Sequence, residues 1–323
     1  MGSSRVWVIT GVNVGLGLAL ALYVSSKGDK VIGTVRAASK FPAELREAGA
    51  LPLVVDLCAS DEEIKRAAEA ALSIFGSVDV LVNNAGYCVF GAIEEVKVSD
   101  FRAQFQTNFF GLIAFTQPFI AHFRNRRCGH IVNTSSMAGC MPFPSLGVYC
   151  ASKAALNAFS DTLSVELKLF GVRVLNVLPG YFSSQLFFRH HDHTSAPSTV
   201  VTSGGSTQLS DVYTDPQAHG YDMVHRYPQM RLEQGQIGDP DKYAQRVYEV
   251  VTGDGFAREL VARPTSDGKW EGPWEFSRVP IGEDCYTLLK QGLDAWGENL
   301  RAFEAIATST NVEQERLQYF PRG

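Results

Sequence analysis

Three residues have the types and the spacing needed to move a proton: Ser136, Tyr149 and Lys153. On a helix, Tyr149 and Lys153 would lie one turn apart on the same face, with about 5–6 Å between their Cβ atoms. A neighbouring ammonium favours the ionised phenol, so we expect Lys153 to lower the pKa of Tyr149 and let it act as a general acid or base. Ser136 follows the apolar pair Ile131 and Val132, which predicts a buried strand ending at a ligand-binding crevice. The three residues therefore predict a site that acts on one oxygen atom.

A tyrosine and a lysine at this spacing also occur as a plain surface contact, so the elements around them decide the interpretation. Residues 5–10 (RVWVIT) predict a strand, and they are followed by Gly11, Gly15 and Gly17 and then by an apolar helical pattern. Such glycines let a pyrophosphate approach the N–H groups of a helix N-terminus. The alternative is a strand-to-helix turn without a ligand.

The residue that follows the second predicted strand (30–35) indicates which dinucleotide binds. An acidic residue at this place would bind a ribose 2′-hydroxyl, whereas an arginine accommodates a 2′-phosphate. Arg36 therefore favours NADP(H), although an arginine at a strand end is also a common surface residue.

Strands and helices continue to alternate along the chain. Further strands are predicted at 51–55, 78–82 and 172–178, and Ser60 with Glu63 forms a capping box for a helix between the first two of these. This alternation predicts an α/β fold, with a parallel sheet covered by helices on both faces. A helix starting near Ser99 carries Asn108 among phenylalanines, and we expect its amide either to cap a neighbouring strand or to hold a water next to Lys153.

Composition excludes several functional classes. The net charge is −5 and basic residues form no run, so the sequence indicates no nucleic-acid surface. No apolar run reaches the ~18 residues of a membrane span. The six cysteines lack metal-ligand spacing, which predicts free thiols, no metal site and a cytoplasmic protein.

Together these motifs resemble the short-chain dehydrogenase/reductase family. TGVNVGLG (10–17) is similar to its cofactor turn, NNAG (83–86) matches a second motif, and Asn108, Ser136, Tyr149 and Lys153 match its catalytic tetrad in order and spacing. Pro179-Gly180 matches the dipeptide before the nicotinamide contacts. The resemblance is close over residues 5–184 and looser over 238–261.

The resemblance implies one three-layer, doubly wound Rossmann domain over residues 1–323, with a seven-stranded parallel sheet ordered 3-2-1-4-5-6-7 and a last strand near 259–262. It implies catalytic roles for the tetrad. It implies NADP(H) contacts from Gly11, Asn13, Gly15, Leu16, Gly17, Arg36, Asp56, Leu57, Asn83, Ala85, Gly86, Tyr149, Lys153, Pro179, Gly180, Phe182 and Ser184. The family usually has threonine where this chain has Ser184, which keeps the hydroxyl but loses a methyl that restricts the rotamers. Family members usually pair through the two long helices that here carry Asn108 and Tyr149, which implies a homodimer or homotetramer.

Two segments extend the fold. Residues 185–237 break the alternation and match the family's substrate lid. Their bulky apolar residues, with Cys140, Met141 and Phe143, indicate a lipophilic substrate; the alternative is that they only pack the loop onto the core. The HHDH sequence at 190–193 is interpreted as loop and not as a metal site. Residues 264–323 form a C-terminal extension with Leu289, Leu293, Trp296, Leu300 and Phe303 in helical register, which covers either the substrate pocket or an oligomer contact.

The sequence thus predicts an NADP(H)-dependent enzyme that interconverts a ketone and a secondary alcohol on a bulky lipophilic molecule, such as a steroid-like, terpenoid or polyketide ketone of secondary metabolism. Two alternatives stay open. One is a net non-redox step such as epimerisation, dehydration or cyclisation, and the other is a dinucleotide-binding sensor without turnover.

Overall fold

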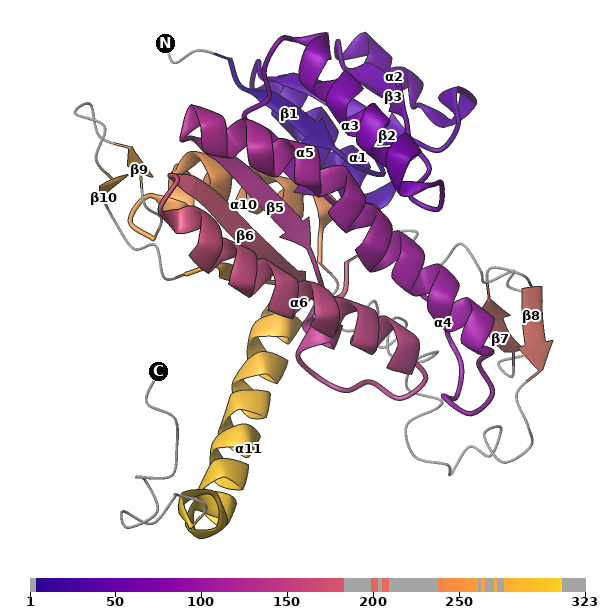
Figure 1. Cartoon of the computed structure of the whole chain (residues 1–323), viewed down its shortest axis with the longest axis vertical. Helices are drawn as coiled ribbons and strands as arrows, with labels where there is room; N and C mark the ends of the chain where they lie inside the picture. Colours follow the sequence, from indigo (N-terminus) through magenta and orange to yellow (C-terminus); the bar gives the residue numbers. More distant parts are fainter. Residues whose placement is uncertain are drawn as a thin grey trace, which may run out of the picture.

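The computed structural model describes residues 4–182, 199–202, 205–208, 238–260, 263–264, 270–271 and 276–309. These residues contain one seven-stranded parallel sheet in the order β11-β6-β5-β4-β1-β2-β3. Counted from its other edge this is the expected order 3-2-1-4-5-6-7, so the fold prediction is confirmed. Figure 1 shows the sheet between layers of helices.

The sheet strands are β1 (Val6–Ile9), β2 (Lys30–Val35), β3 (Leu51–Val54), β4 (Val80–Asn83), β5 (Gly129–Thr134), β6 (Val172–Pro179) and β11 (Arg278–Ile281). The helices are α1 (Gly15–Ser26), α2 (Ala43–Glu47), α3 (Asp61–Ile74), α4 (Val98–Phe105), α5 (Gly111–Arg126), α6 (Gly147–Lys168), α10 (Pro240–Thr252) and α11 (Glu283–Thr308). Two small hairpins, β7 (Thr199–Thr202) with β8 (Gly205–Gln208) and β9 (Arg263–Pro264) with β10 (Trp270–Glu271), complete the described elements.

Each face of the sheet has its own apolar core, because alternate strand residues point to opposite faces. On one face Trp7 and Ile9 of β1 pack with α1 and α10. On the other face Val8 packs with the buried phenylalanines of α5 and with Leu163 of α6. The fold is therefore three layers, with the carboxyl ends of all the sheet strands at one edge.

The last strand lies elsewhere than expected. Glu259 and Leu260 lie in a turn after a 3-10 turn at Gly255–Ala257, and the edge strand is instead β11, which pairs with β6. Both segments are short apolar runs, and Pro280 in β11 argues against a strand unless that strand lies at the edge of the sheet. As an edge strand, β11 accommodates this proline.

Local sequence signals explain two features near the site. Ser60 and Glu63 form the expected capping box at the start of α3. Between α4 and α5 the helix widens into a π-helical turn, Gln106–Phe110, which contains Asn108. Single π-helical turns inside helices are frequent at functional sites.

Much of the expected lid (185–237) and part of the C-terminal extension lie outside the described residues, including Ser184 and the histidines at 190, 191 and 193. Within the described residues, no helix has the length and apolarity required to cross a membrane. The same residues contain no group of three or more side chains suited to bind a metal ion.

Candidate active site

The glycine turn after β1 leaves the start of α1 free to bind an anion. Gly11 and Gly15 have positive φ angles of 71° and 63°, which favour glycine. The N-cap residue Val14 offers no capping side chain, and the first turn of α1 has no acidic residue. The first N–H groups and the positive end of the helix dipole are therefore available to a phosphate. By contrast, the start of α3 is closed by its capping box.

The NNAG segment supports this turn. The Thr10 hydroxyl accepts hydrogen bonds from the backbone N–H groups of Asn84 and Ala85, both at 2.9 Å. The Asn84 side chain donates to the carbonyl of Thr10 at 3.0 Å. A Cβ on Gly17 would lie 2.4 Å from the Asn84 amide nitrogen, so glycine is needed for this close packing.

A cleft of about 730 Å³ runs along the carboxyl edge of the sheet. Twelve of the predicted cofactor residues line it: Gly11, Asn13, Gly15, Leu16, Arg36, Asp56, Leu57, Ala85, Gly86, Tyr149, Lys153 and Pro179. Such a volume is typical of a ligand pocket.

The structure places other predicted cofactor residues away from this cleft. Asn83 is buried, and its amide donates to Thr116 and to Asn133, so it supports the sheet beneath the cleft. Gly17 lies under Asn84, as described above. Gly180 and Phe182 line a neighbouring smaller pocket, and Ser184 lies outside the described residues.

Of the four predicted catalytic residues, Ser136 follows β5, Tyr149 and Lys153 lie on α6, and Asn108 lies in the π-helical turn between α4 and α5. Tyr149 and Lys153 are both buried in the first half of α6, and the Lys153 ammonium lies 5.7 Å from the centre of the Tyr149 ring. Lys153 Nζ donates to the Thr134 carbonyl at 2.8 Å. Ser136 caps the 3-10 turn Met137–Gly139, where its hydroxyl oxygen accepts a hydrogen bond from the Ala138 N–H at 3.1 Å, and its side chain lines the same small pocket as Tyr149.

Burial decides the protonation of this pair, and it contradicts the expectation that Lys153 lowers the pKa of Tyr149. Burial, reinforced by the nearby Cys88, raises the pKa of the Tyr149 phenol well above its ordinary value, and the neighbouring Ser136 hydroxyl acts in the opposite direction. Burial also lowers the pKa of Lys153 to about 8. As the pH rises, Lys153 therefore loses its charge before Tyr149 ionises. At neutral pH the site holds a protonated phenol beside an ammonium.

Asn108 is hydrogen-bonded on both sides of its amide, as expected for a buried polar group. Its oxygen accepts from the Tyr87 N–H at 3.1 Å, and its nitrogen donates to the Tyr87 carbonyl at 2.9 Å. A Cβ built on Gly86 would lie 3.1 Å from Asn108 Oδ1 and 3.7 Å from Lys153 Nζ. Asn108 thus fixes the strand end, and Gly86 keeps the space between the amide and the ammonium free of side chains.

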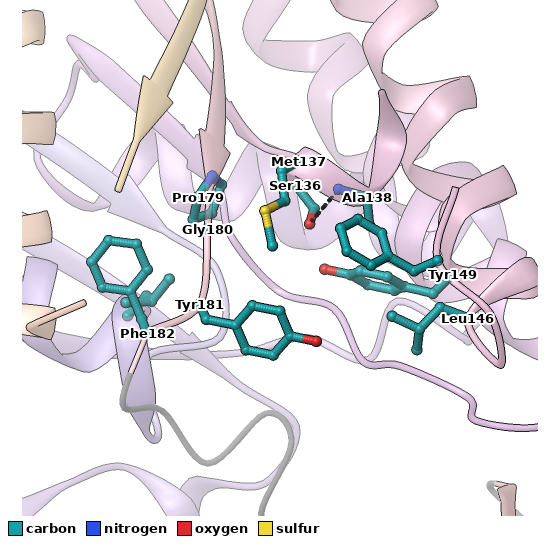
Figure 2. A pocket seen from close by; sticks show the side chains of 11 residues that line it. Ser136, Met137, Ala138, Leu146, Tyr149, Pro179, Gly180, Tyr181 and Phe182 are labelled. Carbon is teal, nitrogen blue, oxygen red and sulfur yellow. Dashed lines mark hydrogen bonds between the residues drawn. The ribbon is translucent and has the colours of Figure 1, made fainter. Parts of the chain in front are cut away.

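A second, smaller pocket of about 40 Å³ adjoins the cleft and shares Leu16, Tyr149 and Pro179 with it. Its other lining residues are mostly apolar: Met137, Ala138, Phe143, Leu146, Gly180, Tyr181 and Phe182, with Ser136. Figure 2 shows the hydroxyl groups of Ser136, Tyr149 and Tyr181 facing this space. Tyr149 therefore lies where the two pockets meet.

A buried carboxylate holds one wall of the small pocket. Asp284, in the first turn of α11, is 3% exposed and accepts a hydrogen bond from the Tyr181 N–H at 2.8 Å. A Cβ on Gly180 would lie 2.1 Å from Asp284 Oδ1, so glycine is required here. Of the expected wall residues, Phe143 lines the pocket, whereas Cys140 and Met141 do not.

Sequence reasoning missed several residues of the site. Lys40 lines the cleft with Arg36 and follows it by four residues in the sequence, so the short spacing between two cations was the available signal. Asn84 lines the cleft in place of Asn83. Asp284 is about a hundred residues from its partner Tyr181, and no sequence pattern connects the two.

Comparisons with known proteins agree with this geometry. Residues 5–194 match the family described as short chain dehydrogenase. The uncharacterized oxidoreductase YusZ of Bacillus subtilis (strain 168) is 32% identical over 261 residues, which are 77% of this chain and 85% of that protein. The 3-ketodihydrosphingosine reductase of Bacteroides thetaiotaomicron is 36% identical over 180 residues, which are 56% of this chain and 65% of that protein.

A solved structure is similar over almost the whole chain. A short-chain dehydrogenase from Streptomyces avermitilis superposes with a TM-score of 0.75 at 28% identity, covering 96% of this chain and 99% of that chain.

Proposed function

Since this chain belongs to the short-chain dehydrogenase/reductase family, whose members bind a nicotinamide dinucleotide and act on CH–OH and C=O groups, we propose that it is an NADPH-dependent reductase of bulky, lipophilic ketones. The proposal includes one Rossmann-type domain over residues 1–323, with 185–237 as the substrate lid and 264–323 as a C-terminal extension.

One observation carries the proposal. The phenol of Tyr149 borders both the large cleft and the small apolar pocket, and it is protonated at neutral pH, since burial raises its pKa above the ordinary value near 10. A protonated group at the junction of a dinucleotide site and an apolar pocket is suited to give a proton to a carbonyl oxygen.

The residues of the cleft fit a phosphorylated dinucleotide. The uncapped start of α1 suits the pyrophosphate, and the exposed cations Arg36 and Lys40 at the end of β2 suit a 2′-phosphate. An arginine can bind a phosphate with two parallel hydrogen bonds. This pair of cations supports NADPH over NADH.

The proposed mechanism needs few protein groups. When bound, the reduced nicotinamide supplies the hydride to the carbonyl carbon. Ser136 donates a hydrogen bond to the carbonyl oxygen, and Tyr149 donates the proton to the same oxygen. The two hydroxyls face the same small pocket (Figure 2), which supports contact of both with one oxygen atom.

Lys153 and Asn108 position these groups. Lys153 is anchored on the Thr134 carbonyl and carries its proton below about pH 8, so it holds positive charge beside the phenol during turnover at neutral pH. Asn108 fixes Tyr87 and faces the gap beside Gly86, where a water could pass a proton to Lys153.

The walls of the small pocket are mainly aliphatic and aromatic, which supports an apolar substrate. The name of the Bacteroides relative, a 3-ketodihydrosphingosine reductase, also supports a ketone on a lipophilic molecule.

We further propose a homodimer or homotetramer formed through the helices that carry Asn108 and Tyr149. Phe110 is 53% exposed, and Val165 and Leu169 on the outer side of α6 and at its end are 75% and 80% exposed. Apolar side chains this exposed support a contact along these helices.

The test is consumption of NADPH with a panel of bulky apolar ketones, with the products identified by mass. We expect NADPH oxidation matched by formation of the secondary alcohol. A product at unchanged oxidation level without NADPH consumption would favour the non-redox alternative.

The cofactor preference is tested with the double variant Arg36→Ala, Lys40→Ala. Because each charge-assisted contact contributes about 1.5–3 kcal/mol, we expect the KM for NADPH to rise at least about tenfold and the KM for NADH to stay unchanged. Lys168→Ala, which removes an exposed cation at the end of α6, is the matched control. Equal effects on both cofactors would contradict the assignment.

A further inference from the structure

Helix α11 carries a stripe of large apolar side chains that the described part of the chain does not cover. Leu293 is 72% exposed, Trp296 61%, Leu300 57% and Phe303 52%. Figure 1 shows α11 running away from the sheet and its covering helices. A contiguous patch of this kind on a soluble protein usually marks an interaction site.

The first part of the helix is anchored on the body of the protein, and the stripe begins where this anchor ends. Cys285 is buried, Leu288 and Leu289 pack beside it, and Gly292 abuts Met141 so closely that a Cβ would lie 2.2 Å from its sulfur. From residue 293 onward the side chains of α11 are exposed apart from Gly297, which is half-buried.

The stripe has the spacing of a helix pair. Its members follow one another at intervals of three, four and three residues, and Leu289 and Tyr286 extend the same alternation toward the start of the helix. Apolar residues repeating every 3.5 residues on average form the a and d positions of a two-stranded coiled coil. A single helix with such a seam needs a second helix.

We propose that α11 pairs with α11 of a second copy of this chain in an antiparallel arrangement. The two-fold axis crosses the helix pair at the height of residue 298. In this register Leu293 lies opposite Phe303 of the partner subunit, and Trp296 lies opposite Leu300 of the partner subunit. All four apolar side chains of each stripe then enter the shared seam.

Charges beside the seam select the antiparallel arrangement. Lys290 and Glu304, both exposed, follow the seam residues Leu289 and Phe303 on the same flank. In the antiparallel register Lys290 lies at nearly the same height along the helix pair as Glu304 of the partner subunit. The two-fold symmetry creates a second, equivalent pair of charges at the other end of the seam. In a parallel pair the two charges would stand about 21 Å apart along the axis, since each residue advances the helix by 1.5 Å.

Residue size agrees with this register. Gly297 lies at the axis opposite Gly297 of the partner subunit, which leaves space for the two Trp296 rings. Asn299, on the other flank, meets Asn299 of the partner subunit, and two amides can bond to each other.

The contact is of modest size. Four large side chains with about 100 Å² free on each bury roughly 800–1,000 Å² in total, at the low end of specific interfaces. We therefore expect pairing that depends on protein concentration in the micromolar range.

The experiment measures the mass of the full chain by analytical ultracentrifugation from about 1 to 100 µM. Wild type is expected to double in mass over this range, and Leu300→Glu is expected to halve the mass reached at high concentration. Glu298→Lys, on the opposite face of α11, is the matched control and should behave as wild type. Unchanged circular dichroism shows that each variant is folded.

The register is tested by exchanging charges. Lys290→Glu alone and Glu304→Lys alone should each weaken pairing at least about threefold, and the double variant should restore it. Wild type of constant mass, Leu300→Glu with the wild-type mass profile, or a double variant no better than the single ones would each overturn the proposal. A contact through α5 and α6 would survive Leu300→Glu, so the two interfaces are distinguished.

Discussion

Lys153 provides a quantitative test of the electrostatics of the site. Its pKa falls from 10.5 to about 8 on burial, and this shift corresponds to about 3 kcal/mol against the charged form. Between these two pH values the unfolded chain keeps the lysine proton while the folded chain has lost it. Stability therefore rises with pH across this window, because the unfolded state binds more protons.

The perturbation is Lys153→Met, which removes the titrating group. We expect the free energy of unfolding of wild type, minus that of the variant, to rise by up to about 1.4 kcal/mol per pH unit between pH 8 and 10. The assay is urea denaturation at pH 7, 8, 9 and 10. Subtraction cancels the contributions of groups that titrate alike in both proteins.

Lys168→Met is the control, because Lys168 is exposed at the end of α6 and its loss should give no such rise. A difference between wild type and Lys153→Met that is flat from pH 7 to pH 10 would refute the reasoning. It would mean that the Lys153 ammonium is well solvated. Burial would then not cause Lys153 to lose its proton before Tyr149 does.

Three further perturbations follow from single contacts. Asp284→Ala leaves the Tyr181 N–H without its acceptor, and we expect a loss of about 1–3 kcal/mol in stability and a raised KM for the ketone, with NADPH affinity unchanged in a fluorescence titration. Burial, with Arg173 nearby, lowers the pKa of His130 from 6.5 to about 3, so the free energy of unfolding should decrease as the pH drops through this range. In thermal denaturation at pH 4 to 7, the melting temperature of His130→Asn should therefore decrease less than that of wild type. Gly86→Ala places a methyl 3.1 Å from Asn108 Oδ1, and we expect kcat to fall at least about tenfold with an unchanged melting temperature; wild-type kcat would contradict a role for the gap.

Much of the fold could be predicted because its signals are local. The glycine turn, the capping box at Ser60 and the alternation of strands and helices depend on neighbouring residues, and they predicted an α/β fold with a parallel sheet. The strand order was predicted from the family resemblance. The edge strand could not be placed, since residues 259–262 and β11 are both short apolar runs. Pairing with β6 distinguishes them, and this contact joins residues about a hundred positions apart.

The same distinction applies to the site. The positions of Tyr149, Lys153 and Ser136 followed from motif spacing, whereas the protonation of the phenol depends on burial by Cys88 and other distant segments. Asn83 is the last residue of β4 and is buried, whereas Asn84 is the first residue after the strand, so its place at the carboxyl end of β4 could have favoured Asn84 for the cleft. The anchoring of Tyr181 by Asp284 required the folded chain.

The most direct measurement is the single-turnover rate of Tyr149→Phe, with Tyr181→Phe as the matched loss of a neighbouring hydroxyl. If Tyr149 gives the proton, its variant should lose about 10²–10⁴-fold in rate and still bind NADPH with a Kd within about twofold of wild type, while Tyr181→Phe retains most of the rate. Hydride transfer at near wild-type rate in Tyr149→Phe would contradict the assignment of the proton to this phenol.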